Sequence, residues 1–433
     1  MSKSTLKKVL FVALFAALLT CCLVIGIAAA PADDAAAVSE GYVARTGDEG
    51  TDTYYKTLTE AIAAVPENGT VTVIANTALD ASLNLTKSVT LAGNGVISTS
   101  AAGAHTIVLA GNVHLTVTGN AEIKATGNNA SAIYQSASAN TEITLSGNAK
   151  VTSNYWTINY NQNTGNTANV KVTISENASV SGKYGITINK KFLLNLTMTG
   201  GAITTTSSDA VYVDSASTDG TANINISGGT IAAKRYGIYL MKLSRLTMKM
   251  TGGSVSGTTG IYVQATVNQV EINLFGGSVS GTTDAAVWLN PVKNSTYSDC
   301  VVNVDGASLT GKQYAIAFQG YSGGNAIAYM TVNVKESDPA KPTLLSVTDT
   351  TLTESKGVFR MVDASQVELN VSGGTFTTAG KACVFYASNV DGYTKFNLSG
   401  GTAITNGSYF FWNNGRTFDV TLSGSFDTGD GQT

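Results

Sequence analysis

Residues 224–290 read INISGGTIAAKRYGIYLMKLSRLTMKMTGGSVSGTTGIYVQATVNQVEINLFGGSVSGTTDAAVWLN, and a pattern that ends in two glycines returns in them at Gly228, Gly252 and Gly276. The pattern is apolar, polar, apolar, any residue, Gly, Gly. A fixed return of 24 residues indicates one structural unit that is stacked many times. The repeat predicts one elongated body, although 433 residues could form two or three ordinary domains.

Thirteen units align on this pattern, with an average return of about 28 residues, and two positions in every unit are apolar. Two residues before the first glycine, or the residue aligned with it, stand Leu91, Val117, Leu145, Ile174, Met198, Ile226, Met250, Leu274, Val304, Val334, Val371, Leu398 and Leu422. Four residues before it stand Val89, Leu115, Ile143, Val172, Leu196, Ile224, Met248, Ile272, Val302, Val332, Leu369, Phe396 and Val420. Alternation with a period of two predicts a strand with one buried face.

The residue between these two apolar positions is Thr or Asn in all units except one, and it must point outward. Stacked Asn side chains can hydrogen-bond to the Asn above and below. The Gly-Gly pair allows a tight turn, because glycine carries no β-carbon. Further short strands follow in each unit, among them GITI, AVYV, GIYL, GIYV, AVWL and AIAF. We therefore expect two or three strands per turn around an apolar core.

The coil period, the GG turns and a short amphipathic opening segment, YYKTLTEAIAAVPENG, resemble the right-handed parallel β-helix of the pectate-lyase-like superfamily, especially its bacterial extracellular and surface proteins. The resemblance covers roughly residues 54–426. It implies an all-β, right-handed parallel β-helix solenoid of about 13 coils with a short N-terminal capping helix. It does not fix an activity, because enzymes, adhesins and phage fibres share the same core pattern.

The N-terminus, residues 1–37, has the features of a targeting segment. Lys3, Lys7 and Lys8 precede an apolar run and then small residues, which is typical of a secretory signal peptide, with cleavage expected near residues 35–37. A retained membrane anchor or lipid attachment at Cys21 are the alternatives. All three place the folded chain outside the cytoplasm, as a secreted or cell-surface bacterial protein.

Residues 38–53 are polar and without period, so we expect a linker there. The solenoid should occupy residues 54–433. Its C-terminal end shows no capping helix, and an open last coil invites pairing. We therefore expect a longer natural chain, or another subunit, to cover that end.

Composition limits the classes of partner and chemistry. The formal net charge is −3, and about −6 once the lysines of the leader are removed, which gives no support to nucleic-acid binding. Membrane contact is expected only through the N-terminal segment. His105 and His114 are the only histidines, which disfavours a site that uses imidazole as a base or as a metal ligand. Cys300 and Cys383 should lie about three layers apart, too far for a disulfide.

Catalytic motifs are sparse. Galacturonan hydrolases of the family that the chain resembles carry an Asn-Thr-Asp triplet, an Asp-Asp pair, His-Gly and Arg-Ile-Lys, and none of these occurs in the coils. The family's lyases hold Ca²⁺ with clustered carboxylates beside a basic side chain. The candidates here are Asp209, Asp214, Asp219 and Asp284. We assign no catalytic or metal-binding residue and no cofactor, with Ca²⁺ implied only for a lyase.

Four aromatic residues fall at one outward position in four consecutive coils: Tyr212, Tyr239, Tyr262 and Trp288. Their rings should line up along the outer wall. Such a row could hold a glycan by stacking on sugar rings, and these residues are our glycan-binding candidates. Alternatively, the rings pack on one another and stiffen the sheet.

Basic residues cluster beside this row. The basic-patch candidates are Lys190, Lys191, Lys234, Arg235, Lys242 and Arg245. Asp214 lies near the level of Lys190 and Lys242, which favours a surface of salt bridges over an anion groove. A functional patch would bind an acidic polysaccharide.

Taken together, these features favour a non-catalytic secreted or surface-displayed scaffold for adhesion or glycan binding. A polysaccharide lyase or glycoside hydrolase acting on acidic polysaccharide is the alternative hypothesis. A structural stalk or fibre is the second.

Overall fold

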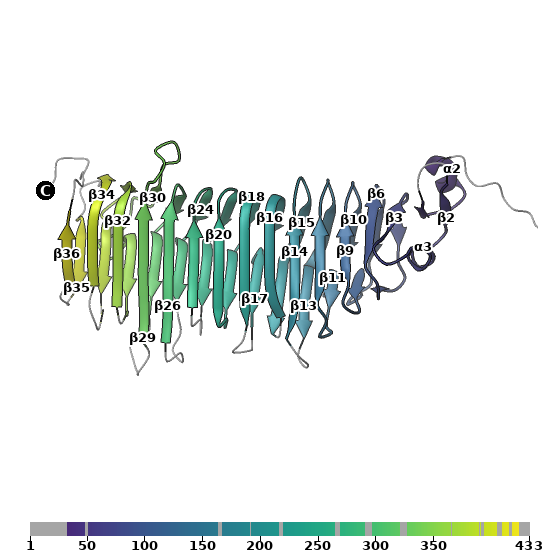
Figure 1. Cartoon of the computed structure of the whole chain (residues 1–433), viewed down its shortest axis with the longest axis horizontal. Coiled ribbons are helices and arrows are strands. Elements are labelled where there is room, and N and C mark those ends of the chain that lie inside the picture. Colours follow the sequence, from purple (N-terminus) through teal and green to yellow (C-terminus); the bar gives the residue numbers. More distant parts are fainter. Residues whose placement is uncertain are drawn as a thin grey trace, which may run out of the picture.

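The structure is a computed structural model, and it describes residues 33–47, 51–162, 167–190, 192–215, 220–264, 269–290, 297–320, 327–364, 366–388, 390, 394–404, 409–414 and 418–423. These residues form an all-β parallel solenoid, as predicted. Figure 1 shows one long stack with the helices at its N-terminal end and the last strands at the other. Residues 1–32 of the predicted leader lie outside the described residues.

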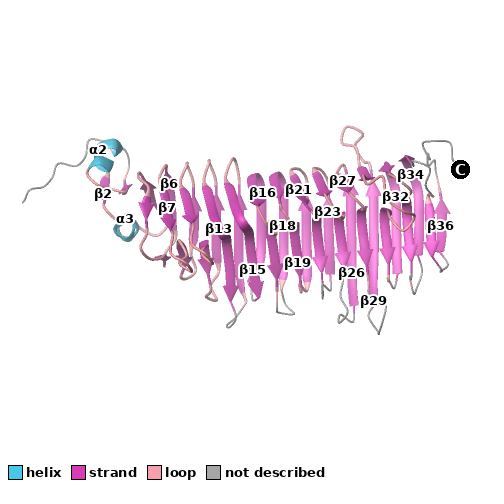
Figure 2. Cartoon of the chain, turned by 180° about the vertical axis from the view of Figure 1, so that it is seen from behind, coloured by secondary structure: helices cyan, strands magenta, loops and turns pink. Residues whose placement is uncertain are grey.

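The solenoid has three walls, and each turn adds one strand, parallel to its neighbours, to each wall. Figure 2 shows that strands make up nearly all of the stack. The first wall consists of β3 (Gly69–Val73), β6 (Val89–Gly93), β9 (His114–Val117), β12 (Thr141–Leu145), β14 (Ala168–Ile174), β16 (Phe192–Thr205), β18 (Thr221–Ala232), β20 (Arg245–Met250), β23 (Gln269–Leu274), β26 (Tyr297–Asp305), β29 (Ile327–Lys335), β32 (Gln366–Thr377), β34 (Thr394–Ile404) and β36 (Phe418–Leu422).

The second wall consists of β4 (Thr77–Ala78), β7 (Val96–Thr99), β10 (Glu122–Ala125), β13 (Lys150–Gln162), β15 (Ser179–Lys190), β21 (Ser254–Gly257), β24 (Ser278–Gly281), β27 (Ser308–Gly311) and β30 (Leu344–Val347), with the later parts of β16, β18, β32 and β34. The third wall consists of β5 (Leu83–Leu85), β8 (Ile107–Leu109), β11 (Ser131–Gln135), β17 (Val211–Asp214), β19 (Tyr236–Met241), β22 (Thr259–Gln264), β25 (Ala285–Asn290), β28 (Tyr314–Gln319), β31 (Gly357–Val362), β33 (Cys383–Ser388) and β35 (Phe411–Asn414), with the later parts of β13 and β15.

The first wall confirms the register that the repeat predicted. Each residue of the predicted column from Leu91 to Leu422 pairs with the next one, rung by rung. Val71 adds a further rung below Leu91, which the repeat alignment did not include. Among the described residues the first wall contains 14 strands, in agreement with the prediction of about 13 coils. After β36 the described residues contain no further strand that would complete a turn.

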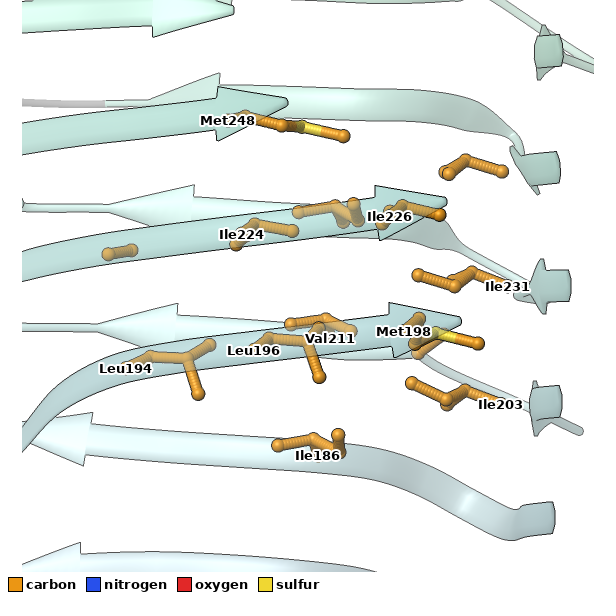
Figure 3. Packing of buried hydrophobic residues seen from close by; sticks show 14 of the residues in the cluster. Ile186, Leu194, Leu196, Met198, Ile203, Val211, Ile224, Ile226, Ile231 and Met248 are labelled. Carbon is orange, nitrogen blue, oxygen red and sulfur yellow. The ribbon is translucent and has the colours of Figure 1, made fainter. Parts of the chain in front are cut away.

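The apolar positions of the first wall face a continuous core. Leu196 and Met198 are fully buried and lie beside Ile224 and Ile226 of the next rung, as Figure 3 shows. All members of both predicted columns are buried except those of the last strand, where Val420 is 39% and Leu422 69% exposed. The alternating apolar residues of the sequence therefore form the core, and the core ends at the last rung.

Asparagine ladders run along the outside, as predicted. Amide hydrogen bonds of 2.6–2.9 Å link Asn273, Asn303, Asn333, Asn370 and Asn397 in order. A second ladder, not predicted, joins Asn94, Asn120, Asn148 and Asn177 at the turn after the first wall. Each ladder satisfies side-chain donors and acceptors between neighbouring rungs, which holds the coils in register.

The N-terminal cap is α3 (Leu58–Ala64), a short helix inside the segment where the sequence predicted one. Thr57 is its N-cap and accepts a hydrogen bond from the backbone N–H of Glu60, 3.2 Å away. Leu58 and Ile62 are buried in the same core as the first coils. The helix ends before Pro66, which disfavours helical backbone in the preceding residue. It thus covers apolar side chains of the first rung.

Residues 38–53, predicted as a linker, contain regular structure. The helix α2 (Asp34–Ser39) leads into β1 (Ala44–Thr46), which pairs antiparallel with β2 (Thr53–Tyr55) and with β3. Arg45 binds the carboxylates of Asp34, at 2.9 Å, and Asp52, at 2.6 Å. The segment has no repeat because it is an antiparallel addition to the end of the stack, so periodicity could not reveal it.

The structure of α2 bears on where a leader would be cut. Cleavage near residues 35–37, as the sequence suggested, would divide α2 and remove Asp34, the partner of Arg45. The triplet Ala30-Pro31-Ala32 also offers small residues at the two positions that a signal peptidase reads. We predict that a cleaved leader ends at Ala32 and leaves Asp33, the N-cap of α2, as the first residue. Intact mass of the secreted chain tests this, and a start within residues 36–38 contradicts it.

Cys300 and Cys383 are free thiols, as predicted, and both are buried. Burial raises the pKa of each thiol to about 12. At neutral pH both are therefore protonated core residues with little nucleophilic character.

Candidate functional site

The four aromatic candidates form one row on the outside of the third wall. Tyr212, Tyr239, Tyr262 and Trp288 come from β17, β19, β22 and β25, and each is in register with the next. They face outward because their neighbours in the strands, such as Ile238 and Leu240, fill the core. The predicted alignment is therefore present, one ring per rung. We call this set the aromatic row.

The rings of the aromatic row touch one another. Ring centroids lie 5.3 Å apart for Tyr212 and Tyr239, 5.2 Å for Tyr239 and Tyr262, and 5.8 Å for Tyr262 and Trp288. Tyr239 and Tyr262 are nearly parallel, with an interplanar angle of 13°. Tyr239 is thereby buried, while the other three keep part of their surface in solvent. The row both stiffens the wall and offers exposed ring surface at three of its rungs.

Polar side chains fix the phenol groups of the row. The Tyr212 hydroxyl donates to Asp214 Oδ2 at 3.3 Å, and the Tyr239 hydroxyl donates to Gln264. Burial raises the pKa of Tyr239 to about 12, so this hydroxyl stays protonated well above neutral pH. These two outward-facing partners fix the orientations of the Tyr212 and Tyr239 phenol groups.

Two further rings pack against the aromatic row and were missed in the sequence. Tyr236 lies 4.9 Å from the rings of both Tyr239 and Tyr262, and Tyr314 lies 6.1 Å from Trp288. Strict alternation from Tyr239 would turn Tyr236 inward. Gly237 and the next residue are both buried, however, so Tyr236 emerges on the outer face. The repeated Gly or Ala at this place in each unit was the signal that could have shown it.

A buried carboxylate holds one cation at the edge of the aromatic row. Asp209 is 2% exposed and accepts two hydrogen bonds from the Arg235 guanidinium, one of them 2.7 Å from Nε to Oδ1. The guanidinium carbon lies 5.0 Å from the ring centre of Tyr236 and 5.5 Å from that of Tyr239. The bond to Asp209 raises the pKa of Arg235 further. Arg235 therefore presents a permanent, oriented charge, and its side chain is still 47% exposed.

The predicted basic patch is divided between two corners of the coil. Lys234 and Arg235 precede the third wall, whereas Lys190, Lys242 and Arg245 lie where the third wall leads into the first. At that second corner Lys242 binds Asp214 at 3.2 Å, and Arg245 donates to Gln269 at 2.7 Å. Lys191 lies outside the described residues. Arg235 is the member of the patch that the structure joins to the aromatic row.

The acidic candidates are held apart. Asp209 binds Arg235, Asp214 binds Lys242, and Asp284 accepts from Gln313 at 3.3 Å. Burial raises the pKa of Asp284. Asp219 lies outside the described residues. Within the described parts of the chain, no group of three or more His, Cys, Asp or Glu side chains could hold a metal ion.

A scan against protein-family models found no match, and searches of the curated proteins and of the solved structures found none either. In the part of the chain that the structure describes, no helix has the length and apolar character needed to span a bilayer. The function is therefore inferred from the geometry of the surface.

Proposed function

We propose that this chain is a non-catalytic scaffold, secreted or displayed on the bacterial surface, that binds a glycan along the aromatic row. The row itself carries the proposal: rings repeat once per rung, at about 4.8 Å, beside a charge held in place by Asp209. One sugar residue of an extended glycan has a comparable length. The apolar faces of successive sugar rings can therefore meet successive aromatic side chains.

Membership in the pectate-lyase-like group of β-helices is part of this proposal. The Gly-Gly turns, the coil length and the capping helix α3 support it. An extracellular location agrees with the predicted leader. No nucleic acid, and no membrane contact beyond the N-terminal segment, is proposed.

The lyase or hydrolase hypothesis has weaker support. Hydrolysis of a glycosidic bond commonly needs two carboxyl groups that face each other across the bond. Here Asp209 and Asp214 are each engaged by a different basic residue, Arg235 and Lys242. Incubation with acidic and neutral polysaccharides, with and without Ca²⁺, tests this. New reducing or unsaturated ends would overturn the non-catalytic proposal.

We predict that Tyr262→Ala and Trp288→Ala each weaken glycan binding about five- to tenfold, because each removes an aromatic contact worth about 1–1.4 kcal/mol. Wild type is first profiled on a glycan array, and the best glycan is titrated calorimetrically against both variants. Tyr134→Ala is the matched control, since it removes an outward ring from the third wall on β11, away from the row.

Thermal unfolding of the same variants separates binding from stiffening of the wall. If the variants bind like wild type but melt earlier, the rings serve only to stabilise the sheet and the proposal fails. Absence of any glycan bound by wild type also defeats it.

A further inference from the structure

The outer surface is hollowed at the corner between the second and third walls, beside the N-terminal end of the aromatic row. The hollow measures about 420 Å³. Its lining includes Glu122, Lys124, Thr152, Asn154, Ser181 and Lys183. The strand β13 contains one more residue here than β15, with a register shift between Ser153 and Trp156. Such a bulge bends a strand and turns side chains outward, which accounts for the irregular corner.

Aromatic residues follow two residues of the lining in the sequence: Tyr155 follows Asn154, and Tyr184 follows Lys183. Tyr155 packs edge-on against Trp156 at 4.2 Å and lies 5.3 Å from Tyr184. The Lys183 ammonium group lies over these rings, 4.7 Å from the centre of Tyr155 and 5.7 Å from that of Tyr184. A cation on aromatic faces keeps its outer side free for an anion.

The charges of the hollow favour a negatively charged guest. Among the described residues, neither Lys124 nor Lys183 takes part in a salt bridge. Glu122, the one carboxylate among the lining residues, accepts a hydrogen bond from the Thr152 hydroxyl at 2.7 Å. Two ammonium groups thus line the same hollow and, within the described part of the chain, lack a carboxylate partner.

The hollow lies beside the aromatic row, on the side of Tyr236 and Arg235, whereas the column of the row itself continues to Thr187. Lys183 and Arg235 occupy corresponding places, each directly before a ring at the start of the third wall, on β15 and β19. One rung, that of β17, lies between them, so they are about 10 Å apart along the axis. Asp209 and Arg235 both act electrostatically on Tyr184. A glycan on the row that extended toward the N-terminus along the side of Tyr236 and Arg235 would reach the hollow.

We propose that this hollow is the end subsite of the glycan site and holds a sugar that carries an anionic group, a carboxylate or a sulfate, against Lys183. The inference rests on the proposed function. An acidic sugar offers the negative charge that the two lysines of the hollow lack. Lys183 is the specificity-determining residue, and Lys124 contributes a second positive charge.

The test compares tetrasaccharides that share one backbone and differ only in the terminal sugar, which is glucose, glucuronic acid or sulfated glucose. Wild type is expected to bind an acidic form about tenfold more tightly than the neutral one, an advantage that shrinks with added salt. Lys183→Met keeps an apolar stem over the rings and should remove most of that preference, with Lys124 retaining the rest, while neutral binding stays. The two acidic arms identify whether carboxylate or sulfate is the recognised group.

Steric filling provides an independent check with a matched control. Ser181 lines the hollow, and Ser256 occupies the same outward column of the second wall three rungs later. Ser181→Phe should therefore remove the preference for the acidic terminus, whereas Ser256→Phe should leave it unchanged.

Two outcomes distinguish failure of this inference from failure of the proposed function. If wild type binds all three tetrasaccharides equally, and Lys183→Met and Ser181→Phe change nothing while Tyr262→Ala still weakens binding, the hollow is not a subsite but the row stands. If no glycan binds to wild type at any concentration tested, both proposals fall.

Discussion

Replacing Leu196 with aspartate is expected to lower the free energy of unfolding by on the order of 5 kcal/mol or more. Leu196 is fully buried in β16, between Val172 of the rung below and Ile224 of the rung above. The substitution removes an apolar side chain from a packed core and puts an unpaired carboxylate in its place. Each rung contacts only its neighbours, so the damage interrupts the stack near its middle.

Urea denaturation followed by circular dichroism measures this loss, with limited proteolysis to locate the opened region. Thr197→Asp is the control, because Thr197 is the next residue of the same strand and faces outward between Thr173 and Asn225. A charge at this outward position should lower the free energy of unfolding by about 1 kcal/mol or less. Equal losses for the two variants would refute the assignment of inner and outer faces.

The register of the first wall could be predicted because it depends on patterns between residues that are close together in the sequence. Apolar residues two positions apart specify which face is buried, and the Gly-Gly pairs mark where each strand ends. Once the units are aligned, stacking in parallel leaves one register, and Leu91 through Leu398 obey it. The Asn ladder followed from the same alignment, since Asn303 and its neighbours occupy one outward column.

The sequence predicted the members of the candidate site only along those parts of the strands where inward and outward residues alternate strictly. Tyr212, Tyr239, Tyr262 and Trp288 could be placed from the period of two. Tyr236 could not, because two consecutive buried residues precede Tyr239 and reverse the expected face.

Contacts between units were also hidden from the sequence. The bond between Asp209 and Arg235 joins residues 26 positions apart, on neighbouring rungs, and no motif marks it. The hollow beside Lys183 depends on a bulge in β13, whose position the repeat does not encode. For this reason the sequence indicated a basic patch, whereas the structure separates its members and gives Arg235 a distinct partner.

Gly229→Ala is expected to destabilise the solenoid by about 3 kcal/mol. Gly229 is the second glycine of a Gly-Gly turn and has a φ of +83°, a left-handed conformation that costs residues with a β-carbon roughly 1–2 kcal/mol. An added β-carbon would also overlap the carbonyl oxygen of Gly200 and lie 2.7 Å from that of Gly201. Both atoms belong to the backbone of the rung below, so neither can move away without disturbing the stack.

Two other glycines separate the conformational cost from the steric one. Gly103 has a φ of +72° but open space where a β-carbon would lie, so Gly103→Ala should cost only the conformational part. Gly111 has neither restriction, and Gly111→Ala should be neutral or slightly stabilising, because alanine lowers the entropy of the unfolded chain. Chemical denaturation of the three variants should therefore rank them Gly229, Gly103, Gly111 in loss of stability. If Gly229→Ala is as stable as Gly103→Ala, the coils can move apart at this turn to admit a β-carbon. The close contact of successive Gly-Gly turns would then not determine the spacing of the rungs.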